Sequence, residues 1–219
     1  MLQLDPTESR VLGVLVEKAF TSSGYPMSLN ALTDGCNQKS NRHPLVNWDE
    51  DRVLAALDSL RAKGLVIFAD TMGSRVTKFR HNSREVLGLG EHELVILTEL
   101  LLRGPQTAGE LRARAQRMQP LENLDVVRAA LTRLMERPEP LVQRIPGGRA
   151  ERFAQLLCPK LHPLEESAAT PDVPASPAAS PDRLERLEQE VAGLRQMIQR
   201  LAEALGASDI LNPPAEHHE

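Results

Sequence analysis

The chain is poor in aromatic residues and in cysteine, and it contains no long apolar run. Aromatic residues make up 3% of its 219 residues, so any core must be built from Leu, Val, Ala and Ile. Its two cysteines, Cys36 and Cys158, provide neither a disulfide framework nor a metal-ligand cluster. There is no apolar stretch of about 18 residues or more, and no signal-peptide pattern at the amino terminus. We therefore expect a cytoplasmic protein that does not contact a membrane.

Sequence motifs of catalysis and cofactor binding are also absent. The chain has no Gly-rich phosphate loop, no His-Glu-x-x-His, no Cys-x-x-Cys and no Gly-x-Ser-x-Gly. Cys158 and His162 are one helical turn apart, but two ligands are too few for a protein zinc site. We expect a protein that is not an enzyme and that uses no cofactor and no metal ion.

What the chain does contain is one pattern that occurs twice before residue 160. The residues of the first copy return in the same order, at offsets between 74 and 85: Leu4, Glu8, Leu12 and Leu15 as Leu89, Glu93, Leu97 and Leu100; Val53, Ala56, Leu57 and Leu60 as Val127, Ala130, Leu131 and Leu134; Lys78-Phe79 as Arg152-Phe153. Such a repeat indicates a duplicated small domain. We predict one domain at residues 1–86 and a second at residues 87–160.

Each copy predicts three helices followed by a β-hairpin. Asp5 caps the first helix, Pro6 occupies its first position and Glu8 completes a capping box. Ser28 caps a short second helix. The remaining elements are predicted from hydrophobic periodicity and turn residues: in the first copy a helix at 49–63 and strands at 65–69 and 76–80, and in the second copy helices at 108–116 and 124–136 and strands at 141–145 and 151–156.

Three helices followed by a hairpin are typical of the winged helix-turn-helix. The predicted fold class is therefore mainly α with small β-hairpins (α+β), in the form of tandem winged helix-turn-helix domains. A Pro/Ala-rich linker at residues 161–181 and a coiled-coil-like helix at residues 182–206 follow, and residues 207–219 are predicted to form a disordered tail.

The predicted terminal helix carries an apolar stripe with alternating spacings of three and four residues. Its members are Leu184, Leu187, Val191, Leu194, Ile198, Leu201 and Leu205. Leu at every d position and β-branched residues at the inner a positions favour a parallel two-stranded coiled coil. We predict a homodimer through residues 184–205. The alternative is a helix that packs its stripe against its own domain, because about three heptads are marginal for a zipper.

Charge is distributed unevenly along the chain. Residues 1–160 hold 22 Lys and Arg against 19 Asp and Glu, a net of +3, whereas residues 161–219 hold 4 against 11, a net of −7. An excess of three positive charges is small for a DNA-binding protein. The third helix of the first copy also begins with Asp49-Glu50-Asp51, which suits the helix dipole but would repel phosphates.

Basic residues of the hairpins, of the second helix in copy two and of the loop at residues 37–43 are the candidates for nucleic-acid contacts. They are Lys39, Arg42, Arg75, Lys78, Arg80, Arg112, Arg114, Arg149 and Arg152. In a winged module the third helix enters the major groove and the hairpin contacts adjacent backbone. The alternative is that these are solvated surface charges, and that the amides of the loop only cap helix ends.

The loop also carries a family resemblance. Residues 36–46, Cys-Asn-Gln-Lys-Ser-Asn-Arg-His-Pro-Leu-Val, together with residues 4–18 and 57–66, resemble the bacterial YceH family. The resemblance covers residues 2–158 and implies tandem winged-helix domains in a cytoplasmic bacterial protein, but it implies no biochemical activity. His43 departs from the family pattern, which has an acidic residue there.

Two functions of different classes follow from these patterns. The favoured one is DNA binding, and transcriptional regulation in particular, with double-stranded DNA as the partner. The alternative is a protein-interaction scaffold whose partner is another protein and which makes no nucleic-acid contact. The fold analogy favours the first, whereas the acidic start of the third helix and the small basic excess favour the second.

The predicted homodimer gives the first testable expectation. Leu194→Glu places a carboxylate in the middle of the apolar stripe, so we expect the chain to become monomeric. Sedimentation analysis of the full chain measures this directly. An unchanged mass would contradict the coiled-coil dimer.

Overall fold

The computed structural model describes residues 2–69, 76–145 and 150–162, all of which belong to one compact unit, Met1–Ala169. Its first half contains the helices α1 (Pro6–Thr21), α2 (Leu29–Cys36) and α3 (Glu50–Ala62). The strands β1 (Met27–Ser28), β2 (Val66–Ala69) and β3 (Lys78–His81) form an antiparallel sheet in the order β1-β3-β2. The three predicted helices and the hairpin of the first copy are therefore confirmed; the two-residue strand β1 and the short helix α4 (Ser83–Leu87) were not predicted.

The second half has the same order of elements. It contains α5 (Glu91–Arg103), α6 (Ala108–Ala115), α7 (Leu124–Met135) and the hairpin of β4 (Val142–Ile145) and β5 (Arg152–Gln155), followed by a 3-10 turn at Pro159–Leu161. Gln106 bridges to Phe153 of β5 at the place where Met27 of β1 pairs with Phe79 of β3. The described residues are thus a mixture of helices and small antiparallel sheets, with the predicted elements of the second copy also present.

The repeated glutamate has the same structural role in both halves. Asp5 and Glu8 form the predicted capping box of α1, and the Glu8 carboxylate also accepts hydrogen bonds from Lys63 Nζ (2.6 Å) at the end of α3. Glu93 caps α5 in the same way and pairs with Arg133 of α7. A carboxylate that closes the first helix and binds a cation of the third helix explains why this residue recurs in the repeat.

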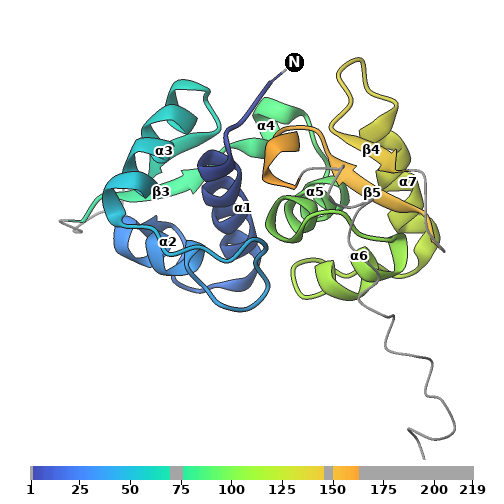
Figure 1. Ribbon diagram of the computed structural model, residues 1–219, viewed down its shortest axis with the longest axis horizontal. Helices are drawn as coiled ribbons and strands as arrows, with labels where there is room; N and C mark the ends of the chain where they lie inside the picture. Colours follow the sequence, from blue (N-terminus) through green and yellow to red (C-terminus); the bar gives the residue numbers. More distant parts are fainter. Residues whose placement is uncertain (1, 70–75, 146–149, 163–219) are drawn as a thin grey trace, which may run out of the picture. The chain divides into compact units, whose positions relative to one another are not determined.

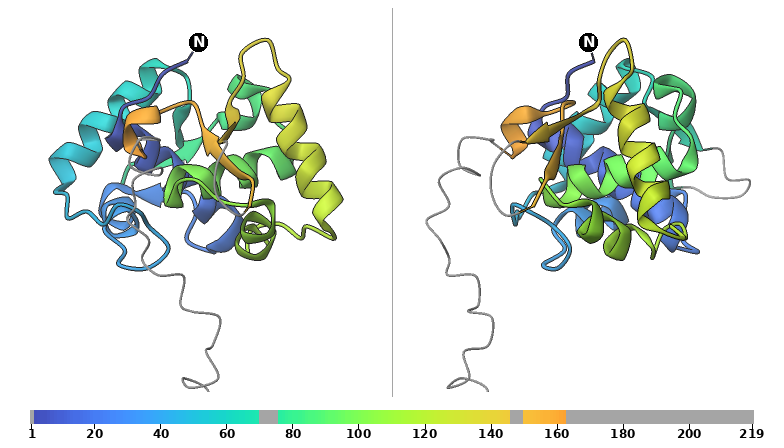
Figure 2. Two further views of the ribbon diagram at one scale, coloured as in Figure 1. Left: turned by 45° about the vertical axis from the view of Figure 1, so that its right-hand side comes forward. Right: turned by 90° about the vertical axis from the view of Figure 1, so that its right-hand side faces the viewer.

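The two halves pack through α1 and α5, which lie side by side (Figure 1). A Cβ at Gly13 of α1 would lie 2.9 Å from Leu102 Cδ2, so a larger residue there would have to displace this leucine from the interface. Leu4 N–H donates to Leu157 O (2.8 Å), and the Pro159–Leu161 turn (orange in Figure 2) lies beside α1. The buried apolar side chains of both halves consequently form one continuous cluster.

A buried group of charges crosses the same interface. Arg42, from the loop after α2, pairs with Glu17 of α1 and donates its Nε–H to Gly35 O (3.1 Å). Arg117, just after α6, pairs with Glu17 and with Glu99 of α5 (2.9 Å). Burial raises the pKa of the Glu17 carboxyl, but the Arg42 and Arg117 guanidinium groups outweigh burial and lower this pKa below its usual range. Arg117 therefore joins the two halves through a pair of buried carboxylates.

Residues 163–181 of the predicted linker, the terminal helix with Leu184 to Leu205 and the tail at 207–219 lie outside the described residues. The first two residues of the predicted linker, Leu161 and His162, are buried against the unit. The domain boundaries at 86/87 and 160/161 stay predictions. Within the described ranges, none of the helices combines the length and apolar character required to cross a membrane.

The buried pair of Arg42 and Glu17 gives a prediction for stability. We expect Arg42→Met to lower the free energy of unfolding by about 3 kcal/mol, because it removes one partner of a buried ion pair. Arg128→Met is the control, since Arg128 pairs with Asp125 on the surface, and we expect it to cost less than about 1 kcal/mol. Urea unfolding of both variants measures the difference. Equal losses in the free energy of unfolding would mean that the buried pair stabilises the fold no more than the surface pair does.

His162 gives a prediction for pH. Its ring is buried, its Nε2 lies 2.7 Å from His43 O, and burial lowers its pKa to about 4. Since the unfolded ring has a pKa of about 6.5, the unfolded chain binds more protons between these values, and stability is lost as the pH falls through that window.

We therefore expect His162 to contribute a loss on the order of 2 kcal/mol between pH 8 and pH 5. Unfolding free energies of the natural chain and of His162→Phe at both pH values test this. The variant should show the smaller loss, and an identical pH dependence would rule out His162 as the titrating group.

Candidate protein-binding groove

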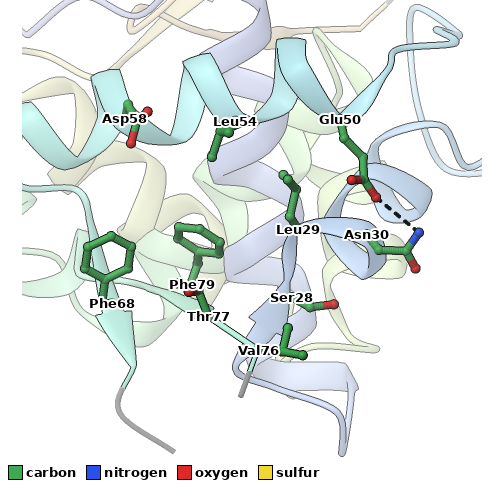
Figure 3. Close-up of a pocket in the computed structure, with 10 residues that line it drawn as sticks. All are labelled: Ser28, Leu29, Asn30, Glu50, Leu54, Asp58, Phe68, Val76, Thr77 and Phe79. Atoms are coloured by element: carbon green, nitrogen blue, oxygen red, sulfur yellow. Dashed lines mark hydrogen bonds between the residues drawn. The ribbon is translucent and has the colours of Figure 1, made fainter. Parts of the chain in front are cut away.

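Helix α3 and the β2–β3 hairpin enclose a groove on the surface of the first half (Figure 3). Its volume is about 650 Å³, and its lining residues come from α3, from the hairpin and from the β1–α2 junction: Ser28, Leu29, Asn30, Glu50, Leu54, Asp58, Phe68, Val76, Thr77 and Phe79. Asp49 caps α3 and Ser28 caps α2, so the caps fix how both helices begin beside the groove.

The floor of the groove is apolar and open to solvent. Leu54 is 37% exposed, Phe68 49% and Val76 57%, although side chains of this kind are usually buried. Leu54 projects from α3 toward the rings of Phe68 and Phe79, whose centroids are 5.6 Å apart (Figure 3). Among the described residues six large apolar side chains are exposed, and three of them line this one groove.

The rim of the groove is acidic. Glu50 and Asp58 both project from α3, and Glu50 accepts a hydrogen bond from Asn30 Nδ2 (3.3 Å). Asp58 pairs with Arg61 one turn later (3.0 Å), and the Arg61 guanidinium lies 3.7 Å above the centre of the Phe68 ring. The described lining residues include two carboxylates and no lysine or arginine.

The second half has arginine at two positions where the groove of the first half exposes a large apolar side chain. The register of the repeat aligns Leu54 with Arg128 and Phe68 with Arg144, and Arg144 pairs with Glu151 (2.8 Å). Asp58 aligns with Thr132. The apolar groove is therefore a property of the first half and not of the repeated fold.

The basic residues predicted to contact nucleic acid do not share one surface environment in the first half. Lys39 and Arg80 are exposed and Lys78 is half-buried, whereas Arg75 lies outside the described residues. Arg42 is only 6% exposed and its guanidinium is held by Glu17, so a phosphate could reach it only if that pair opened.

In the second half the predicted basic residues mostly bind the protein itself. Arg112 donates to Leu121 O (3.1 Å) and Glu122 O (2.7 Å), and Arg114 donates to Gln106 Oε1 (2.8 Å). Arg152 donates to Pro105 O (2.6 Å). Arg149 lies outside the described part of the chain. These contacts leave the nucleic-acid role of the set as a prediction.

The loop at residues 36–48 is held in place by buried and partly buried hydrogen bonds. Arg10 donates to Cys36 O (3.3 Å) and Pro44 O (2.7 Å), and Asn37 bonds both the N–H and the carbonyl of Trp48 (2.8 Å each). Burial raises the pKa of the Cys36 thiol to about 12, which keeps it protonated and unreactive. The family-like residues of this loop thus position α2 and α3, and with them the groove.

The groove itself was not predicted from the sequence. The only signal for it was the row Glu50, Leu54 and Asp58, in which one exposed apolar residue stands between two acidic residues at helical spacing. Across residues 2–69, 76–145 and 150–162, no three His, Cys, Asp or Glu side chains are grouped so that they could hold a metal ion.

Comparison with known proteins places the chain in a family. A family model described as "Protein of unknown function, DUF480" matches residues 4–162. The UPF0502 protein of Pelobacter propionicus is 49% identical over 204 residues, which cover 90% of this chain and 93% of the relative. UPF0502 proteins of Burkholderia ambifaria and Geotalea uraniireducens are 44% and 46% identical over 93% and 89% of this chain, and over 90% and 91% of their own lengths. These matches confirm the predicted family resemblance: the chain belongs to the DUF480 (UPF0502) family of bacterial proteins.

Proposed function

We propose that this chain is a protein-interaction module, in which two winged helix-turn-helix halves form one body and the groove of the first half binds a partner protein. The observation that carries the proposal is the gathering of three exposed apolar side chains, Leu54, Phe68 and Val76, in one groove. Apolar patches of this kind, rimmed by polar residues, mark interaction sites. The proposal assigns binding and no catalytic step.

The face of α3 supports a protein partner over DNA. In a winged module this is the helix that enters the major groove. Here its exposed residues include Asp51, Leu54 and Asp58, so carboxylates would meet the phosphates. Arg52 does not compensate, because its guanidinium bonds Thr7 Oγ1 (3.2 Å) and lies 4.7 Å from the centre of the Trp48 ring.

DNA binding is the second candidate. It is favoured by Arg80, which is exposed on β3 next to the half-buried Lys78, and by the exposed Lys39 in the loop before α3. These three charges could contact backbone phosphates without help from α3. Regulation of transcription would be the corresponding role.

The proposal is tested by selecting peptides that bind the full chain from a displayed random library. We expect Leu54→Asp to weaken the selected peptides at least tenfold, because it places a charge in the apolar floor. Arg128→Asp, at the matching position of α7, is the control and should leave binding unchanged. Selected peptides whose affinity is unchanged by Leu54→Asp would contradict the proposal.

The same preparation distinguishes the second candidate. Fluorescence anisotropy with a random DNA duplex at two salt concentrations should stay flat at micromolar protein. Binding that weakens steeply with salt would instead support DNA, because neutralised phosphates release counterions.

A further inference from the structure

We infer that the groove recognises a polypeptide segment in which an aliphatic side chain lies between two arginines or lysines. This inference rests on the proposed function and names the chemistry of the partner. It starts from three lining residues of α3, Glu50, Leu54 and Asp58, which are spaced at intervals of four residues. Residues at this spacing lie on one face of a helix, so the groove presents an acidic, an apolar and a second acidic group in a row.

The negative charges on the groove walls are only partly balanced by neighbouring cations. Of the ten lining residues that the structure describes, two are carboxylates and none is basic. Asp51, on the same helix, adds a third exposed carboxylate nearby in sequence. Arg61 is the nearby cation, and its 3.0 Å pair with Asp58 leaves Glu50 with an amide partner, Asn30. A partner that carries positive charge would complement this surface.

Arg61 also shows how the groove holds a cation. Its guanidinium lies 3.7 Å above the Phe68 ring while it pairs with Asp58, so an aromatic face and a carboxylate bind one arginine together. Phe68 remains 49% exposed with this arginine in place. Asp58, Leu54 and Phe68 line the same end of the groove (Figure 3), so a partner arginine there would meet a carboxylate and an exposed aromatic ring.

The spacing of the row sets the spacing of the partner. Eight residues along a helix correspond to about 12 Å between Glu50 and Asp58. An extended segment covers about 13 Å in four residues. The segment that fits is therefore a basic residue, any residue, an aliphatic residue, any residue and a second basic residue, with the aliphatic side chain placed on Leu54.

The corresponding face of the second half provides an internal contrast. There Arg128 replaces Leu54 and Thr132 replaces Asp58, while Leu124 stands at the position of Glu50. The row on α3 is acidic, apolar and acidic, whereas the corresponding row on α7 is apolar, basic and polar. The second half should not bind the same segment.

The test uses the full chain and two labelled peptides, Gly-Arg-Ser-Leu-Ser-Arg-Gly and its twin with glutamate in place of both arginines. We expect the basic peptide to bind at least tenfold tighter than the acidic one in fluorescence anisotropy. Glu50→Gln and Asp58→Asn should each weaken the basic peptide about three- to tenfold. Asp51→Asn removes an equal charge from the same helix outside the groove lining, so it should change binding less than twofold.

The double variant Glu50→Lys/Asp58→Lys should reverse the preference and bind the acidic peptide more tightly. If a peptide binds and responds to Leu54→Asp but not to these charge changes, the partner chemistry is wrong and the proposed function stands. If neither these peptides nor any selected peptide depends on Leu54, the inference and the proposed function both fall.

Discussion

The packing of α1 against α5, together with the Glu17–Arg117–Glu99 bridge, is the constraint on which the rest of the described structure depends. It turns a duplicated pattern of three helices and a hairpin into one body with a continuous core. Glu17, a member of this bridge, also pairs with Arg42, which donates to Gly35 O and so ties the loop between α2 and α3 to α1. Because α3 forms one wall of the groove, the geometry of the groove depends on contacts that begin at the interface between the halves.

The two halves keep the same skeleton but differ in what they expose. Glu8 and Glu93 cap and brace the first helix of each half in the same way, and Phe79 and Phe153 occupy the same position in the hairpins. Outside this skeleton, the second half carries the ion pair of Arg144 and Glu151 where the first half exposes Phe68. The two halves therefore share their internal packing and differ in the residues that they expose.

The elements of the fold were predictable because their signals are local. The caps at Asp5 and Ser28 and the helical stripes depend on residues within a turn or two, and the structure confirms them. β1 was missed because two residues show no alternation. Arg42 and Arg80 look alike in the sequence, but only Arg42 is buried. Its burial depends on Glu17, which lies 25 residues away in the chain. The groove forms because α3 faces Phe68. This is a tertiary contact, and hydrophobic periodicity along the sequence does not predict it.

Gly13 makes the contact between the two halves asymmetric. In the register of the repeat Gly13 corresponds to Thr98, and Leu102, which fills the space beside Gly13, corresponds to Glu17. Two first halves joined in the same arrangement would therefore set a carboxylate, instead of a leucine, against the glycine. Two second halves would lack the glycine and crowd a threonine side chain into the contact. In this register the contact between Gly13 and Leu102 is therefore one between unlike halves, and two copies of either half would lack it.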